Sequence, residues 1–285
     1  MSVLQIHAQP SRTTVWILSW FLFASGVAGY FWVSRGRHLE NPDDRVMPTL
    51  RQMGRAFSDA TLKPAEDDEV AANADQQSLA TKIHNSMLWK DTIATGRRFL
   101  ISMALLFPAV LLGLHMGMFP YVGSFFLRFV LFFDKIVALS LLPILFIAFG
   151  IDELAKAMLI VVGVAPTIIL DAFNLTRGVP KEQIVKGFTL GAGDLSIAYR
   201  IVFKQIWPRV LNSIRLNLKS VMLFLFAGEM IASQDGLAYR IALLRRHMGM
   251  DTIIPYVLWV ALLLFLVDFV MRTLNRKLHP WFQEA

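Results

Sequence analysis

The sequence of 285 residues contains no cysteine. This absence excludes disulfide bonds, catalysis by a thiolate, iron–sulfur clusters and zinc sites built from cysteine. Charged residues are also scarce, because they make up 17% of the chain, against about 25% in an ordinary soluble domain. Together with a mean hydropathy of +0.53, this deficit argues against a water-soluble enzyme.

Long apolar runs are what the sequence does contain. A bilayer core about 30 Å thick requires about 20 apolar residues for each helical span. Six stretches approach that length, and they are Val15 to Val33, Phe99 to Met118, Phe125 to Phe149, Leu154 to Phe173, Ile214 to Ala232 and Ile253 to Met271. They predict an all-α, polytopic membrane protein with about six transmembrane helices.

The first stretch has a competing interpretation as a cleaved signal peptide. The apolar region of a signal peptide normally has about 7–15 residues, and this stretch is longer. Its ends carry aromatic side chains in the manner of an interfacial aromatic belt, namely Trp16, Trp20, Tyr30 and Trp32. We therefore expect a retained N-terminal transmembrane helix within residues 1–33.

Residues 34–92 contain no run that could span a membrane. Between Glu40 and Asp75, nine acidic residues stand against four basic ones, a net of −5. The part from Lys63 to Gln77 has too little apolar surface to pack and is expected to be a mobile loop. Behind Pro48-Thr49, apolar side chains recur at helical spacing, which predicts a short amphipathic helix on the membrane surface or on neighbouring spans. They are Met47, Leu50, Met53 and Phe57.

Basic residues predict the orientation. From Arg177 to Lys219, eight basic residues face two acidic ones, a net of +6. Because basic loops stay in the cytoplasm, this loop and the tail at residues 276–285 are expected there, and so is the N-terminus if the spans number six. Residues 34–92 then form a periplasmic segment. The overall charge of +7 needs no nucleic acid as an explanation.

The loop at residues 174–211 carries the most informative pattern. Ile201 follows Gly191 after nine residues, and Pro208 comes later. This spacing resembles the cytoplasmic signature loop of permease subunits of ATP-binding-cassette importers: Glu-Ala-Ala, three residues, Gly, nine residues, Ile-x-Leu-Pro. The chain departs from it, since Val185-Lys186-Gly187 replaces Glu-Ala-Ala and Phe203-Lys204 replaces Leu-Pro.

The flanking sequence resembles the nitrate/taurine/sulfonate branch of these permeases. Leu141-Leu142-Pro143-Ile144, followed by Glu153-Leu154-Ala155-Lys156, is similar to the junction of its third and fourth spans. Gly228-Glu229-Met230-Ile231-Ala232, followed by Gly236 to Ile241, is similar to its fifth span and the next loop. The resemblance covers roughly residues 85–280, and it implies a type I importer permease fold with a five-helix core at residues 93–275.

The resemblance also implies a coupling role for the loop, which would dock on a separate ATPase. The implied coupling residues are Lys186, Gly187, Phe188, Thr189, Leu190, Gly191, Ala192, Gly193 and Asp194. Two short helices are expected to flank a turn at Gly191 to Gly193, where small residues permit tight geometry, and Asp194 is expected to cap the second helix. The chain has no G-x-x-x-x-G-K-[ST] phosphate loop, so we do not expect it to be an enzyme with an ATPase site, and ATP with Mg²⁺ is expected on the partner.

Polar residues within the spans are candidates for the translocation path. They are Ser140, Pro143, Thr167, Asn217, Ser220 and Glu229. Most polar side chains in spans instead form hydrogen bonds between helices. Glu229 is an ionisable residue in a span and so a functional candidate. The family often carries a carboxylate there whatever it transports, which favours a structural or gating role.

We therefore expect the permease subunit of an ATP-driven importer in the bacterial inner membrane. The resemblance implies two ATPase subunits, a second permease copy in a homodimer, and a periplasmic or lipid-anchored solute-binding protein. The implied solute is small and polar or anionic, such as nitrate, a sulfonate like taurine, bicarbonate or a small nitrogen compound. The alternatives are an autonomous secondary transporter or channel, and a membrane-embedded enzyme, for which the sequence offers no clustered His, Asp and Glu.

Overall fold

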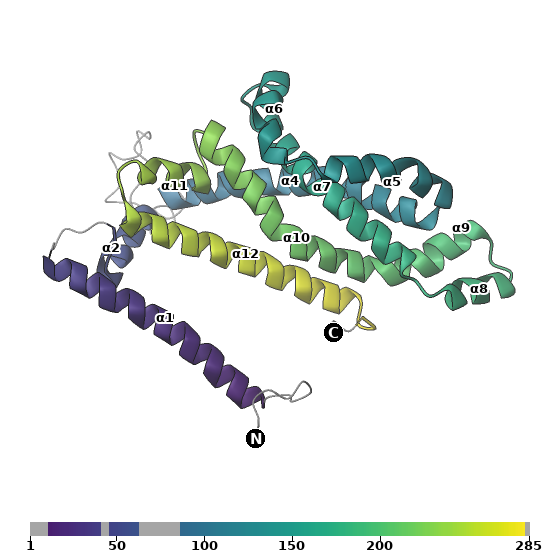
Figure 1. Ribbon diagram of the computed structural model, residues 1–285, viewed down its shortest axis with the longest axis horizontal. Coiled ribbons are helices and arrows are strands. Elements are labelled where there is room, and N and C mark those ends of the chain that lie inside the picture. The colour runs from purple at the N-terminus through teal and green to yellow at the C-terminus, as the bar shows by residue number, and fades with distance from the viewer. Residues whose placement is uncertain (1–10, 41–45, 63–85, 283–285) are drawn as a thin grey trace, which may run out of the picture.

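The computed structural model describes residues 11–40, 46–62 and 86–282, and the regular elements in these ranges are helices (Figure 1). This confirms the predicted all-α class. In chain order they are α1 (Arg12–Glu40), α2 (Leu50–Leu62), α4 (Met87–Met118), α5 (Pro120–Asp134), the 3₁₀ helix η2 (Ala138–Leu141), α6 (Leu142–Phe149), α7 (Glu153–Arg177), α8 (Lys181–Thr189), α9 (Asp194–Ser196), the π-helical η3 (Ile197–Val202), α10 (Phe203–Ala232), α11 (Leu237–Arg245) and α12 (Met250–Leu278). The expected loop from Lys63 to Gln77 lies outside the described residues.

Five of the described helices are long and apolar enough to cross a membrane: α1, α4, α7, α12 and the continuous run from α9 through α10. The stretch from Phe125 to Phe149, expected as a single span, is instead a pair of helical segments that meet at 81°. The break follows Asp134-Lys135, and Pro143 lies in the first turn of α6. Counting this pair as one span gives the six expected from the sequence.

The centre of the bundle is formed by α4, α7 and α10. Buried side chains of these helices share one cluster, which includes Leu106, Val110, Ile160, Val164, Ile206 and Leu225. Small residues let α4 approach α7 closely, because a Cβ atom on Gly113 would lie 2.5 Å from the carbonyl oxygen of Ile169. Such close approach of small residues is how helices associate within lipid, where apolar burial alone gives little driving force.

The amphipathic helix expected behind Pro48-Thr49 is α2. Thr49 begins it, since its Oγ1 accepts a hydrogen bond from the Gln52 backbone N–H at 3.3 Å, and Gln52 Oε1 accepts the Thr49 N–H at 2.7 Å. This reciprocal pair is a capping box. Met53 is buried, and the Phe57 ring lies 6.1 Å from that of Trp259 on α12. Thus α2 packs on neighbouring spans, one of the two positions predicted.

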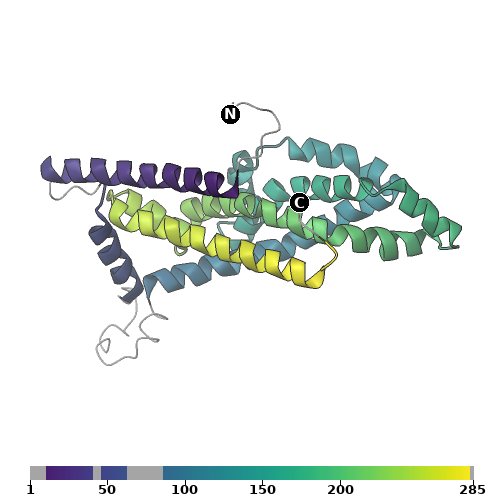
Figure 2. The ribbon, with the colours of Figure 1, turned by 90° about the horizontal axis from the view of Figure 1, so that it is seen from below.

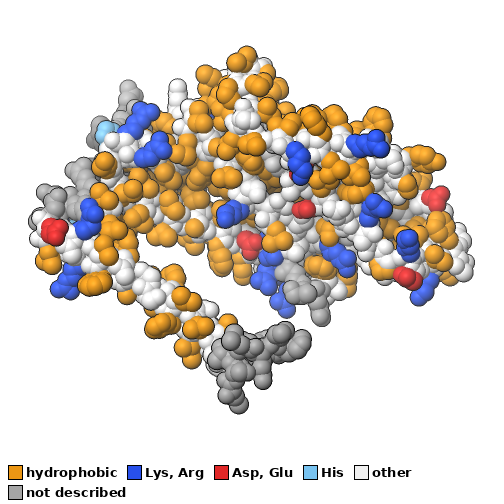
Figure 3. Space-filling view, in the orientation of Figure 1, with side chains coloured by type: hydrophobic (Ala, Val, Ile, Leu, Met, Phe, Trp, Pro, Cys, Tyr) orange, Lys and Arg blue, Asp and Glu red, His pale blue; other side chains and the backbone are white. Residues whose placement is uncertain are grey.

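Helix α1 leans away from the bundle (Figures 1 and 2). None of its apolar window is buried. Near its C-terminal end, Tyr30 donates a hydrogen bond to the Pro48 carbonyl at 3.0 Å and Ser34 donates to the Met47 carbonyl at 2.9 Å. Hydrophobic side chains also cover most of the face in Figure 3, including α1 and the projecting α6.

The elements form two distinct ends of an elongated molecule. Helices α2 and α11 lie at one end of the long axis, and α8 and α9 lie at the other (Figure 1). Because the run from α9 through α10 leads from this second end towards α11, continuous helix connects the two ends.

Candidate functional site

The turn between α8 and α9 forms an exposed tip. Gly191 has φ +81°, a left-handed conformation that glycine adopts without steric cost. Its N–H donates to the Phe188 carbonyl at 2.9 Å, and the Ala192 N–H donates to the Gly187 carbonyl at 3.1 Å. The expected turn flanked by helices is therefore present. The second helix is not a short one, because α9 continues through η3 into α10.

The predicted cap at Asp194 is wrong. The N-cap position of α9 belongs to Gly193, and Asp194 is the first residue of the helix, with no side-chain cap bond at this terminus. An acidic group one position later still faces the positive end of the helix dipole. Asp194 can thus favour the helix start electrostatically without accepting a capping hydrogen bond.

The tip presents apolar side chains to the outside. Of the nine predicted coupling residues, Gly187 is buried, Ala192 is half-buried and the others are exposed. Phe188 is 50% exposed, Leu190 87% and the adjacent Leu195 65%. Beneath them, a Cβ atom on Gly187 would lie 3.0 Å from Ile201, so α8 is seated closely on η3. The tip therefore combines a packed base with an exposed apolar surface, a combination typical of a docking site.

Arg98 organises a second site at the opposite end of the bundle. Its Nε and Nη2 donate to the two carboxylate oxygens of Glu153 at 2.6 and 2.9 Å, a bidentate pair. Its Nη1 donates to Glu229 Oε1 at 3.0 Å and to the Asp235 carbonyl at 2.9 Å, and Nη2 also contacts the Asp235 carboxylate. Lys156 adds a bond to Glu153 at 3.1 Å. One guanidinium thus joins α4, α7, α10 and the loop before α11.

Hydrogen bonds from α4 and α11 complete the surroundings of Glu229. The carboxylate is fully buried, and it accepts bonds from Thr95 Oγ1 at 2.9 Å and from the Ala238 N–H at 3.1 Å. The Leu237 N–H in turn donates to Thr95 Oγ1 at 2.9 Å. A buried charge is costly unless it is paired and hydrogen-bonded, and Glu229 meets both conditions. We call Arg98, Glu153, Glu229 and Asp235 the Arg98 cluster.

A neighbouring ion pair extends this network towards α11. Asp91 is buried and accepts bonds from Arg240 Nε at 3.0 Å and from the Gly236 N–H at 3.1 Å. Gly236 has φ +114°, and a Cβ atom there would lie 2.7 Å from Arg98 Nη1. The loop before α11 therefore requires glycine at this position, both for its backbone and for space.

The remaining path candidates lie in different surroundings. Asn217 joins a polar group between α10 and α7, where its Nδ2 donates to Asp171 Oδ2 at 3.1 Å and Ser213 Oγ donates to the same oxygen at 2.6 Å. Thr167 is exposed and donates to Asp134 Oδ1 at 3.4 Å. The other candidates make no such group: Ser140 bonds to its own turn, Pro143 lies in the first turn of α6, and Ser220 is half-buried on α10. Among the described residues, no cluster of three or more His, Asp or Glu side chains has the arrangement of a metal site.

Most residues of the Arg98 cluster could not be identified from the sequence alone. One pattern did point to it, because Asp91, Thr95 and Arg98 recur at helical spacing on one face of α4, and all three are buried. Such a polar stripe on an apolar helix predicts partners on other helices. The partners themselves lie 131 or more residues away in the cases of Glu229 and Asp235, and spacing alone does not identify them. Asp171 and Ser213 were missed for the same reason.

Comparison with known proteins gives consistent matches. The family model described as "Binding-protein-dependent transport system inner membrane component" matches residues 109–281. The taurine transport system permease protein TauC of Escherichia coli is 26% identical over 205 residues, 70% of this chain and 74% of its own length. The Bacillus subtilis protein named "Putative aliphatic sulfonates transport permease protein SsuC" is 26% identical over 214 residues. The match covers 71% of this chain and 78% of that protein.

Structural comparison agrees on the fold. A chain of the MetNI methionine ABC transporter in inward-facing conformations superposes with a TM-score of 0.52 at 17% identity. The match covers 67% of this chain and 93% of that one. These findings confirm the resemblance to importer permeases and the type I importer permease fold that the sequence predicted.

Proposed function

Because this chain belongs to the family of binding-protein-dependent transport system inner membrane components, we propose that it is the permease subunit of an ATP-driven importer. It moves a small polar or anionic solute inward across the bacterial inner membrane by alternating access. Relatives named for taurine and for aliphatic sulfonates support a sulfonate, within a range that includes nitrate, bicarbonate and small nitrogen compounds.

The exposed tip at α8–α9 is the observation that carries this proposal. Its apolar side chains, Phe188 and Leu190, project from a base held by Gly187 against η3. A partner bound to these side chains would move α8 and α9 together as a rigid unit. We assign this partner role to two ATPase subunits, which bind ATP and Mg²⁺ and hydrolyse the nucleotide. The permease itself works as a homodimer.

The two helices attached to the tip transmit its movement. Helix α7 begins at Glu153 and leads into α8, and the run from Asp194 to Ala232 leads from α9 to Glu229. Both therefore end at Arg98, which binds Glu153 and Glu229 together. When the ATPases close, the pull on the tip reaches the far end of the bundle through both helices, and the Arg98 cluster makes their ends move as a unit. This is a structural or gating role for Glu229.

The same arrangement supports one orientation in the membrane. The tip faces the cytoplasm, where the ATPases are, and the basic loop around it agrees with the charge rule for cytoplasmic loops. Both termini are then cytoplasmic, and the Arg98 cluster, α2 and α11 lie at the periplasmic end. A periplasmic or lipid-anchored binding protein delivers the solute to that end.

Affinity purification tests the assembly. The tagged chain, expressed with its own operon and extracted in mild detergent, should retain an ATPase polypeptide on the resin. Replacing Leu190 by Asp should remove that polypeptide, because a charge then stands on the docking surface. The matched control is Ile151→Asp, also an exposed apolar residue at 69% but located in the loop between α6 and α7, away from the tip and outside the spans. An ATPase never retained by the wild-type chain would contradict the proposal.

A further inference from the structure

A groove of about 560 Å³ lies between α7 and α10. Its walls carry Asp171 and Asn174 from α7, and Arg209, Asn212 and Ser213 from α10. Asp171 lies in the last two turns of α7 and Arg209 in the first two turns of α10, so the groove is close to the tip. Its volume falls within the range of about 300–1,000 Å³ that is common for small-molecule sites.

The side chains along one face of α10 are polar, although they lie within a candidate span. They recur at intervals of three or four residues, which places them above one another on the helix surface, and they are Arg209, Ser213, Asn217 and Ser220. Polar and ionisable side chains within a membrane face the interior of the bundle or a water-filled cavity. We therefore expect this face of α10 to border water and not lipid.

The charged groups of the groove lie close to one another. Ser213 Oγ donates to Asp171 Oδ2 at 2.6 Å, so the carboxylate sits against α10. Arg209 comes four residues before Ser213, and Asn174 comes three residues after Asp171. The Cβ atoms of helical residues at these spacings are about 5–6 Å apart. A guanidinium, a carboxylate and an amide thus surround one small volume.

These groups keep hydrogen-bonding capacity for a ligand. Both hydrogen bonds to the Asp171 carboxylate use Oδ2, which leaves Oδ1. Asn212 accepts the Arg215 Nε–H at 3.0 Å through its carbonyl oxygen, which leaves its amide N–H groups. Within the part of the chain that the structure describes, Arg209 and Asn174 form no ion pair or side-chain hydrogen bond. Guanidinium and amide N–H groups favour an acid group, whereas a carboxylate favours an ammonium group.

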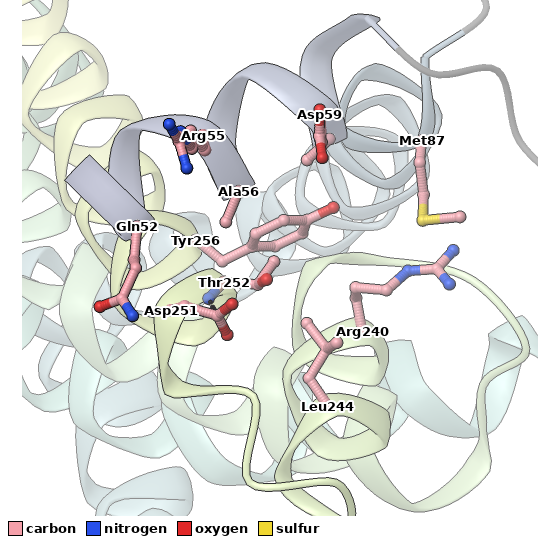
Figure 4. Close-up of a pocket in the computed structure, with 11 residues that line it drawn as sticks. Gln52, Arg55, Ala56, Asp59, Met87, Arg240, Leu244, Asp251, Thr252 and Tyr256 are labelled. Carbon is pink, nitrogen blue, oxygen red and sulfur yellow. Dashed lines mark hydrogen bonds between the residues drawn. The ribbon is translucent and has the colours of Figure 1, made fainter. Parts of the chain in front are cut away.

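The cavity between α2, α11 and α12 lacks this convergence. Its volume is similar, about 480 Å³, but Figure 4 shows Arg55 and Arg240 on different sides of the Tyr256 ring. Asp59 and Asp251 are likewise separated by the ring. Charges placed in this way cannot bind the two ends of one small molecule, whereas those of the groove between α7 and α10 can.

We propose that this groove binds the transported solute, and that the solute is a small zwitterion with an acid group and an ammonium group a few bonds apart. Arg209 holds the acid group, with the amides of Asn174 and Asn212 as further donors, and Asp171 faces the ammonium group. The bound solute joins α7 to α10 close to the tip. This inference rests on the proposed function and narrows its solutes, because nitrate, bicarbonate and simple alkanesulfonates lack a cation for Asp171.

Equilibrium binding to the full chain in lipid nanodiscs tests the site. The solute-binding protein is left out, so that no other protein binds the solute. The probe is radiolabelled taurine, which carries both groups, and its two halves, ethanesulfonate and ethylammonium, compete with it. Taurine should bind, and each half should bind at least about tenfold more weakly, because it loses the charge-assisted contacts of one end.

Two variants separate the two ends of the solute. Arg209→Gln removes an exposed charge and should weaken both taurine and ethanesulfonate by about tenfold. Asp171→Asn keeps an acceptor oxygen for Ser213 but removes the charge. It should weaken taurine by about tenfold and leave ethanesulfonate bound as tightly as before or more tightly, because a like charge is gone. A general effect on folding would not give these opposite responses.

Matched controls are Arg128→Gln on α5 and Asp152→Asn before α7, both exposed and outside the groove. Both should bind taurine like the wild type. The proposal is overturned if taurine does not bind the wild-type chain, if ethanesulfonate binds it as tightly, if Arg209→Gln leaves taurine binding unchanged, or if Asp171→Asn changes the binding of both ligands equally or of neither. ATP-dependent uptake by wild-type proteoliposomes is measured in parallel, so failure of the groove site and failure of the transport function are distinguishable.

Discussion

Glu153 and Glu229 bind the same guanidinium, that of Arg98, although 75 residues, which include α8, α9 and η3, lie between them in the chain. Glu153 begins α7 and Glu229 lies in the last turn of α10. The opposite ends of these two helices carry the exposed tip at α8–α9. The Arg98 cluster and the tip therefore lie at opposite ends of the same pair of helices, α7 and α10.

Removal of the Glu229 carboxylate should destabilise the protein. Glu229→Ala leaves Thr95 and the Ala238 N–H without their acceptor and removes one partner of buried Arg98, and loss of one partner of a buried pair costs about 3–5 kcal/mol. Thermal unfolding in detergent measures the effect. Lys135→Ala, which breaks an ion pair whose lysine is 79% exposed, should change stability by less than about 1 kcal/mol. Equal stability of Glu229→Ala and the wild type would show that the cluster does not brace the bundle.

Gly236→Ala should also destabilise the end of the bundle that holds the Arg98 cluster. The new methyl group would lie 2.7 Å from Arg98 Nη1 and 2.8 Å from Glu229 Cδ, at a φ of +114°. Backbone strain of this kind costs about 1–3 kcal/mol, and the clash adds to it. Gly249→Ala is the control, because its nearest contact is 3.6 Å and its φ is −74°. A lower unfolding temperature is expected for Gly236→Ala alone, and the reverse order would refute the argument.

Gly191→Val should separate folding from coupling. Gly191 has φ +81° with no atom within 4 Å of a new Cβ, so valine would distort the turn without disturbing the core. We expect normal membrane insertion and an unchanged elution profile, but loss of solute-stimulated ATP hydrolysis by the assembled complex. Gly193→Ala, at φ −76° and equally uncrowded, should keep coupling. Full activity of Gly191→Val would show that the tip does not depend on this turn.

Asp171 should act as an acceptor that joins α7 to α10. Asp171→Ala removes the oxygen that Ser213 and Asn217 share, and the net loss for such half-buried hydrogen bonds is about 0.5–1.5 kcal/mol each. Asp171→Asn keeps an acceptor oxygen in the same place and should remain closer to wild-type stability. Chemical unfolding monitored by tryptophan fluorescence compares the two. Equal losses from both variants would mean that the charge, and not the acceptor, matters.

The fold was predictable where it depends on local pattern. Apolar length indicated the spans, and helical spacing behind Pro48-Thr49 indicated α2. The bend between α5 and α6 was not predicted, although Asp134-Lys135 marked its place, because a charged pair alone does not fix an angle of 81°. The capping prediction for Asp194 failed because glycine at the preceding position can hold the cap geometry without a side chain.

The candidate site was predictable only at the tip. Gly191 and its neighbours are contiguous in sequence, so a motif can describe them. The Arg98 cluster depends on contacts between residues far apart in the chain, and in the sequence Arg98 looks like a charge at the end of a span. Glu229 could be singled out for its cost in a membrane, but its partners required the packing of α4 against α7 and α10 to be known.

Solute uptake into proteoliposomes tests the central claim most directly. Vesicles would hold this chain with the ATPase subunit of its operon, with ATP enclosed and the operon's solute-loaded binding protein added outside. We predict uptake that requires ATP, the ATPase and the binding protein together, and no uptake by vesicles that hold this chain alone. Uptake by the chain alone, independent of ATP, would contradict the account and identify an autonomous transporter or channel.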